Sequence, residues 1–126
     1  MDWVACVRFP RLFDVCLVGG LLCAAVDARA APPAAPIVLT IKGHRFTPSE
    51  ITAPAGQRFS IQVRNLDDAP EEFESYDFKV EKIIVPHGVI TVSVGPLKPG
   101  PYKFFGEYNA ATAQAVLRVG PAAGKP

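Results

Sequence analysis

Most of the acidic residues of the chain fall within one short segment, residues 67–81. Beyond residue 30 the chain has nine acidic residues, and seven of them lie in this segment. They are Asp67, Asp68, Glu71, Glu72, Glu74, Asp77 and Glu81. Lys79 is the one basic residue among them. Carboxylates are the ligands that hard cations prefer, so one interpretation is a site for iron, manganese, calcium or a borderline copper or zinc ion.

A second interpretation of this segment needs no metal. A solvated loop followed by an edge strand also collects charge, because charged side chains keep an edge strand from pairing with other chains. If the segment is extended, Glu72 and Glu74 lie on one face and Phe73 lies on the other. Two carboxylates that close repel each other, and a bound cation would relieve the repulsion. The residues alone leave both interpretations open.

The other residues capable of chemistry are scattered along the chain. His44 lies in a predicted loop and His87 in a predicted turn, and neither has a partner at ligand spacing, so we expect both at the surface. The tyrosines are expected to be core or rim aromatics; they are Tyr76, Tyr102 and Tyr108. No serine lies in a setting typical of a nucleophile. The pattern therefore predicts no catalytic residue and disfavours a hydrolase.

The N-terminus has the layout of a secretory signal peptide. Arg8 and Arg11 precede an apolar run over residues 12–26, and the Ala-Arg-Ala of residues 28–30 fits a cleavage site between small residues. The run is shorter than the roughly 20 residues that a spanning helix needs. An uncleaved anchor is the competing interpretation. We predict export to the periplasm, cleavage after Ala30, and no membrane span in the cleaved chain.

Cleavage at that point would remove every sulfur atom from the chain. The three cysteines, Cys6, Cys16 and Cys23, and the single methionine, Met1, all precede residue 30. The exported chain would then have no disulfide, no thiolate nucleophile and no sulfur ligand for a metal.

Length and charge exclude several classes of function. The chain has 126 residues, which is enough for one domain. Thirteen Lys and Arg residues against twelve Asp and Glu residues leave a net charge of +1, which argues against nucleic acid as a partner. The glycine-rich motifs that bind dinucleotides and nucleoside triphosphates are both missing.

Hydrophobic alternation predicts the elements that position these residues. Apolar residues recur at every second position in four segments, residues 37–42, 58–64, 90–94 and 115–119. This period is typical of half-buried strands. Proline and glycine predict turns at residues 54–56 and 98–101. We predict an all-β, Greek-key β-sandwich of six to eight strands over residues 37–120, after a Pro/Ala linker at 31–36 and before a flexible tail at 121–126.

Several stretches of this predicted domain resemble the cupredoxins. The general likeness is carried by residues 51–59, 63–65 and 100–104. A closer likeness to the EfeO-type branch, which comprises small periplasmic cupredoxin-like proteins linked to bacterial iron uptake, is carried by residues 70–75, 95–100, 104–108 and 112–114. The resemblance covers residues 37–120. It implies a site at the end of the sandwich where the loops of residues 66–76 and 106–113 meet.

The ligand pattern of the blue-copper cupredoxins is not kept in this chain. The resemblance puts Glu71 at or beside the first histidine ligand, Gly106 at the cysteine, Asn109 at the second histidine and Thr112 at the methionine. The composition of the cleaved chain therefore excludes a blue-copper centre. The EfeO-type relatives commonly have a histidine where this chain has Asn109, whose amide oxygen can bind a hard cation but is a poor copper ligand.

Two functions follow from these observations. In the first, the chain handles iron or copper in the periplasm, in support of an inner-membrane iron permease, and passes ferrous iron or helps to oxidise it. The metal ligands predicted for this function are Glu71, Glu72, Glu74, Glu107 and Asn109. In the second, the chain is a metal-free binding module with a decayed site, and its acidic loop docks on the basic surface of another periplasmic protein.

Overall fold

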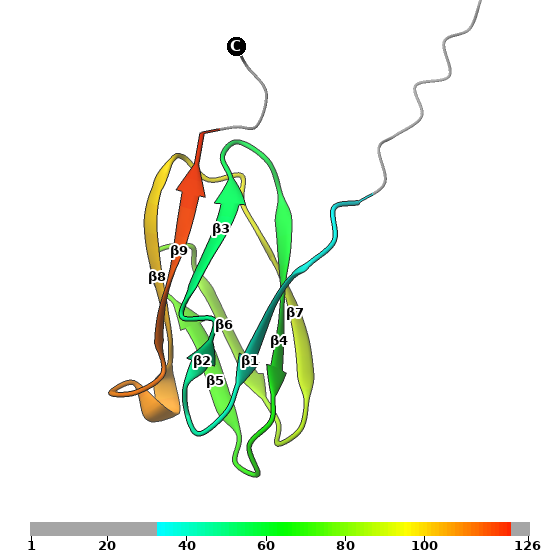
Figure 1. Cartoon of the computed structure of the whole chain (residues 1–126), viewed down its shortest axis with the longest axis vertical. Helices are drawn as coiled ribbons and strands as arrows, with labels where there is room; N and C mark the ends of the chain where they lie inside the picture. Colours follow the sequence, from blue (N-terminus) through cyan, green and yellow to red (C-terminus); the bar gives the residue numbers. More distant parts are fainter. Residues whose placement is uncertain (1–32, 122–126) are drawn as a thin grey trace, which may run out of the picture. The chain divides into compact units, whose positions relative to one another are not determined.

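The computed structural model describes residues 33–121, and the regular secondary structure of this part of the chain is almost entirely β-strand (Figure 1). The nine strands are β1 (Ile37–Ile41), β2 (Phe46–Thr47), β3 (Glu50–Pro54), β4 (Phe59–Asn65), β5 (Glu71–Ser75), β6 (Val80–Ile84), β7 (Val89–Val94), β8 (Gly100–Gly106) and β9 (Gln114–Gly120). A single 3₁₀ turn, η1 (Glu107–Asn109), joins β8 to β9 within the described residues. The predicted signal segment, residues 1–30, lies outside them.

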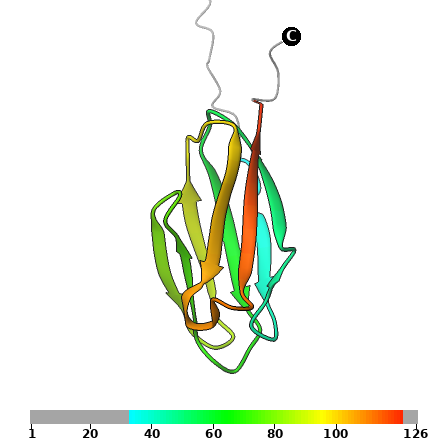
Figure 2. The same ribbon diagram turned by 90° about the vertical axis from the view of Figure 1, so that its left-hand side faces the viewer.

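The strands form two sheets that pack face to face. One sheet has the order β2-β1-β4-β7 and the other has the order β3-β9-β8-β5-β6. The β1–β4 and β3–β9 pairs are parallel, and the other pairs are antiparallel. The chain crosses repeatedly from one sheet to the other, and in Figure 2 β8 and β9 stand in front of the four-stranded sheet. The predicted all-β sandwich is confirmed.

The core lies between the sheets and follows the alternation of the strands. In β4, for example, Ile61 and Val63 are fully buried while Arg64 is exposed. Three phenylalanines from different strands meet at the centre, where the ring of Phe104 lies 5.2 Å from that of Phe73 and 5.3 Å from that of Phe46. Each fully buried apolar side chain of this size stabilises the fold by roughly 1.5–3 kcal/mol.

The number of strands exceeds the prediction of six to eight. One of the nine, β2, has only two residues, which is too short to show any period. Another, β6, has the sequence VEKII, in which apolar residues do not alternate with polar ones. Both strands are held by pairing with a neighbour, β1 or β5, and this pairing is not visible in the local sequence.

No helix within residues 33–121 is long and apolar enough to cross a membrane.

Candidate functional site

Four connections gather at one end of the sandwich, which we call the site end. They are the β1–β2 loop, the β4–β5 loop, the β6–β7 loop and the η1 segment before β9, all at the lower end in Figure 1. Side chains join them, since the Thr112 hydroxyl donates to the carbonyl of His44 at 2.9 Å and His87 contacts Asp68. Residues far apart in the sequence therefore meet here, as the resemblance implied.

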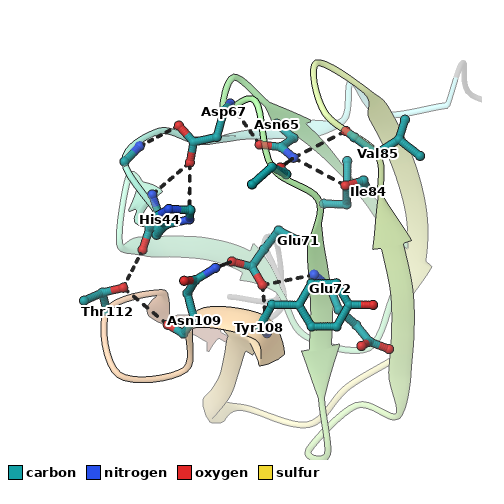
Figure 3. Close-up of polar contacts among 12 residues, drawn as sticks. His44, Asn65, Asp67, Glu71, Glu72, Ile84, Val85, Tyr108, Asn109 and Thr112 are labelled. Atoms are coloured by element: carbon teal, nitrogen blue, oxygen red, sulfur yellow. Dashed lines mark hydrogen bonds and ion pairs between the residues drawn. The ribbon is translucent and has the colours of Figure 1, made fainter.

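Glu71 is the most buried acidic residue at the site end. It is the first residue of β5, its side chain points toward the core, and it is 1% exposed. Its Oε2 accepts a hydrogen bond from the side-chain amide of Asn109 at 2.7 Å (Figure 3). Its Oε1 accepts from the backbone N–H groups of Tyr108 at 3.0 Å and Glu72 at 3.1 Å. Both carboxylate oxygens are thus hydrogen-bonded to the protein itself.

Gly106 leaves the space that this carboxylate needs. A Cβ atom built on Gly106 would lie 2.6 Å from Cδ of Glu71 and 2.8 Å from Cβ of Ala113. Both separations are far below van der Waals contact, so a side chain at position 106 and the carboxylate of Glu71 in its present place exclude each other. The resemblance assigned the cupredoxin cysteine to this position.

A second group of carboxylates lies on the outer side of the five-stranded sheet, and we call it the acidic face. It comprises Glu72, Glu74, Glu81 and Glu107. Glu74 stands directly opposite Glu81 in the antiparallel β5–β6 register, so two like charges share one face of the sheet. Tyr76 and Tyr108 are 70% and 49% exposed. The negative charges of these carboxylates contribute to the raised pKa values of both tyrosines.

Crowding on the acidic face shifts the pKa values of its members. The pKa of Glu72 is raised above its usual value of 4.5 by partial desolvation and by the neighbouring Glu81. The pKa of Glu74 is raised by partial desolvation and then by the charge of Glu107. The charge of Glu74 in turn raises the pKa of Tyr76. The acidic face therefore carries more negative charge than its surroundings offset.

The two histidines have aspartate partners that the sequence did not reveal. The ring Nε2 of His87 lies 2.7 Å from Oδ1 of Asp68, and the ring Nδ1 of His44 lies 3.8 Å from Oδ2 of Asp67. Both were expected at the surface, and their side chains are indeed 63% and 45% exposed. The backbone N–H of His44 also donates to Asp67 at 2.8 Å, and this bond is the main cause of the lowered pKa of Asp67.

The five residues predicted as metal ligands divide into two groups. The buried Glu71 is joined to the half-buried Asn109, whereas Glu72, Glu74 and Glu107 belong to the acidic face. Within residues 33–121, no three His, Cys, Asp or Glu side chains are arranged so as to hold a metal ion. Glu81 was absent from the predicted set because its place opposite Glu74 depends on the strand register.

The residues of the site end do not fit a cupredoxin copper centre. Beyond residue 30 the chain has neither cysteine nor methionine, and these supply two of the four ligands in that pattern. The donors around Glu71 already engage both of its oxygens, and Asn109 presents its amide N–H to the carboxylate. A copper ion would have to displace hydrogen bonds that are already formed.

The mixed two-sheet sandwich, with its candidate site at one end, defines a cupredoxin-like fold. The chain matches the family model of the Cupredoxin-like domain over residues 15–119 and therefore belongs to that family. Amicyanin from Paracoccus versutus (Thiobacillus versutus) matches with a TM-score of 0.54 and 14% identity, over 71% of this chain and 85% of that one. Reduced auracyanin from Roseiflexus castenholzii matches with a TM-score of 0.58 and 17% identity, over 71% and 100%.

The chain is also similar in sequence to a bacterial protein. The protein RP394 of Rickettsia prowazekii (strain Madrid E) is 41% identical to this chain over 83 residues. The match covers 66% of each of the two chains. Another solved structure with this fold is a mutant amicyanin in its Cu(I) form, with a TM-score of 0.54 and 13% identity over 68% of this chain and 82% of that one. The identities of 13%, 14% and 17% to these solved structures establish the shared fold alone.

Proposed function

We propose that this chain is an exported binding module that works without a buried copper centre and docks on a basic partner through its acidic face. The observation that carries the proposal is the direct pairing of Glu74 with Glu81. Like charges placed opposite each other on neighbouring strands destabilise a sheet. Local arrangements that cost stability are typical of functional sites.

The surroundings of the acidic face support docking. Tyr76 and Tyr108 are large exposed aromatic side chains beside the carboxylates, and tyrosine is enriched in protein interfaces. The Tyr76 ring packs edge-on against Phe105 at 5.3 Å, so it is held in place before any partner arrives. The partner expected from the sequence is a periplasmic protein or an inner-membrane iron permease complex. Charge attraction would make association fast and sensitive to salt.

Capture from a periplasmic extract tests this function. The protein, purified after export, is immobilised and exposed to the extract at low salt, with and without a chelator. We expect a partner that binds in both cases, elutes at moderate salt and is not retained by the Glu72→Gln/Glu74→Gln/Glu81→Gln variant. Glu50→Gln is the matched control, because Glu50 is exposed and pairs with Arg118 away from the acidic face. Retention that requires metal would contradict the proposal.

A second candidate function is the handling of iron or copper as cargo for an iron permease. The raised pKa values of Glu72 and Glu74 favour it, because a cation bound between crowded carboxylates would relieve their repulsion. A solved structure with the same fold, a mutant amicyanin, is in a Cu(I) form, although that likeness concerns the fold alone. Glu107 would be the third carboxylate ligand of this surface cluster, since its charge acts on Glu74. Glu71 and Asn109, the other two predicted ligands, are hydrogen-bonded to each other.

Calorimetry with ferrous iron under anaerobic conditions, cupric copper and zinc separates the two functions. Binding near one ion per chain at micromolar concentration or tighter, lost in the Glu72→Gln/Glu74→Gln/Glu107→Gln variant, would establish metal handling. Millimolar or absent binding of all three ions, together with metal-independent capture of a partner, would leave docking as the function.

A further inference from the structure

We propose that Glu71 and Asn109 form an internal clasp that takes the structural place of a metal ion at the site end. The clasp ties β5 to the η1 segment, so that the end of the sandwich closes with no cation at all. This inference is independent of which partner the acidic face binds.

The hydrogen bonds of Glu71 are the first support. A buried carboxylate is costly unless donors satisfy it, and Glu71 has three of them, from Asn109, Tyr108 and its own neighbour Glu72. Hydrogen bonds to an ionised carboxylate are about twice as strong as neutral ones. No buried side-chain nitrogen or oxygen atom within residues 33–121 is left without a partner. The interior of the site end is therefore fully satisfied by protein groups.

The position of Asn109 is the second support. Its backbone carbonyl accepts hydrogen bonds from the N–H groups of Thr112 at 3.0 Å and Ala113 at 2.8 Å, and its side chain reaches Glu71. The hydroxyl of Thr112 continues the chain of contacts to His44 in the β1–β2 loop. One buried carboxylate thereby holds the η1 segment through Tyr108 and Asn109 (Figure 3). The same segment bears Glu107 of the acidic face.

The glycine at position 106 is the third support. The carboxylate of Glu71 fills the space in which a side chain at position 106 would begin. A cysteine ligand at this position and the Glu71 clasp are therefore alternatives. The chain has the glycine, and with it the arrangement that needs no metal.

Exchanging the two partners tests the clasp. In Asn109→Asp two carboxylates face each other where a 2.7 Å hydrogen bond now lies. In the double variant Glu71→Gln/Asn109→Asp the amide of residue 71 donates to the carboxylate of residue 109, while its oxygen still accepts from the two backbone N–H groups. The double variant thus restores all three hydrogen bonds. Thermal melts of each protein are measured with a chelator and with added Mn²⁺.

We expect the melting temperature of the unmodified protein to be the same in chelator and in Mn²⁺. Asn109→Asp should melt roughly 10 °C lower or more at neutral pH, since about 1 kcal/mol corresponds to 4–8 °C in a domain of this size. Its melting temperature should recover on adding Mn²⁺. The double variant should recover without added metal. Glu107→Gln, a neighbouring exposed glutamate, is the control and should change little.

Two results would overturn the proposal. One is a fall in the melting temperature of the unmodified protein when metal is removed. The other is a double variant that is no more stable than Asn109→Asp in chelator. If Asn109→Asp does not fold, the double variant is compared with the unmodified protein, and failure of the double variant to fold as well overturns the clasp.

Discussion

The two faces of β5 put the same residue type to opposite uses. Glu71 and Glu72 are consecutive, yet Glu71 points inward and is 1% exposed, whereas Glu72 points outward beside Glu81. Three hydrogen bonds neutralise the cost of burying Glu71. The outer carboxylates Glu72 and Glu74 instead have raised pKa values, from partial desolvation and from the charges of neighbouring glutamates. The acidic segment therefore holds two regions, an interior one that stabilises the fold and a surface one that is available to a partner.

The largest effect should come from removing the inner carboxylate. Glu71→Ala leaves the amide of Asn109 and two backbone N–H groups without their acceptor and opens a cavity beside Gly106. We expect a loss of about 3–5 kcal/mol in the free energy of unfolding, because each buried donor left without an acceptor costs about 1–3 kcal/mol. Urea denaturation measures it.

Glu72→Ala is the matched control for this prediction, since it removes the same side chain one residue further along the strand. It should change the free energy of unfolding several times less. Equal losses in the two variants would contradict the division of β5 into a structural and a functional face.

A side chain at position 106 should have an intermediate effect. Gly106→Ala forces Cβ against the carboxylate of Glu71 and against Ala113. Overpacking of this kind typically costs about 1–3 kcal/mol. The cost should shrink when Glu71→Ala is present, because the main obstacle is then gone and neighbouring substitutions are not additive. Strictly additive losses in this double-mutant cycle would show that Glu71 does not fill the space next to Gly106.

The smallest effect concerns pH. The pKa values of Glu72 and Glu74 are raised above 4.5, so the folded state holds these protons more tightly than the unfolded state. Their contribution to stability is complete below pH 4.5 and is lost as the pH rises through the raised values. In Glu72→Gln/Glu74→Gln the stability should fall less over this range, as measured by urea midpoints at a series of pH values.

Asp67 provides the opposite slope and serves as the comparison. Its pKa is lowered from 3.8, chiefly by the hydrogen bond from the N–H of His44. Its contribution to stability is therefore present above pH 3.8 and is lost as the pH falls through the lowered value. Asp67→Asn should flatten the curve of stability against pH only below pH 3.8. A change in the range above pH 4.5, where Glu72 and Glu74 titrate, would mean that the acidic face and the β4–β5 loop are coupled.

The sequence by itself determined the class of fold and the limits on its chemistry. Alternation in segments such as residues 58–64 and 115–119 is a local property, and it was enough to predict half-buried strands. The positions of the sulfur-containing residues, all before residue 30, excluded the blue-copper ligand set if the predicted cleavage occurs. The alternation of Glu72 and Glu74 against Phe73 also followed from the period of a strand, and the structure confirms it.

Only the tertiary structure decided what each carboxylate does. Glu71 has the same local pattern as its neighbours, and its role depends on Asn109, which is 38 positions away in the sequence. Glu81 joins the acidic face through the register of β5 and β6, and the aspartate partners of His44 and His87 depend on how loops meet at the site end. Burial, strand register and loop contacts join residues distant in the chain, so no local pattern of residues specifies them.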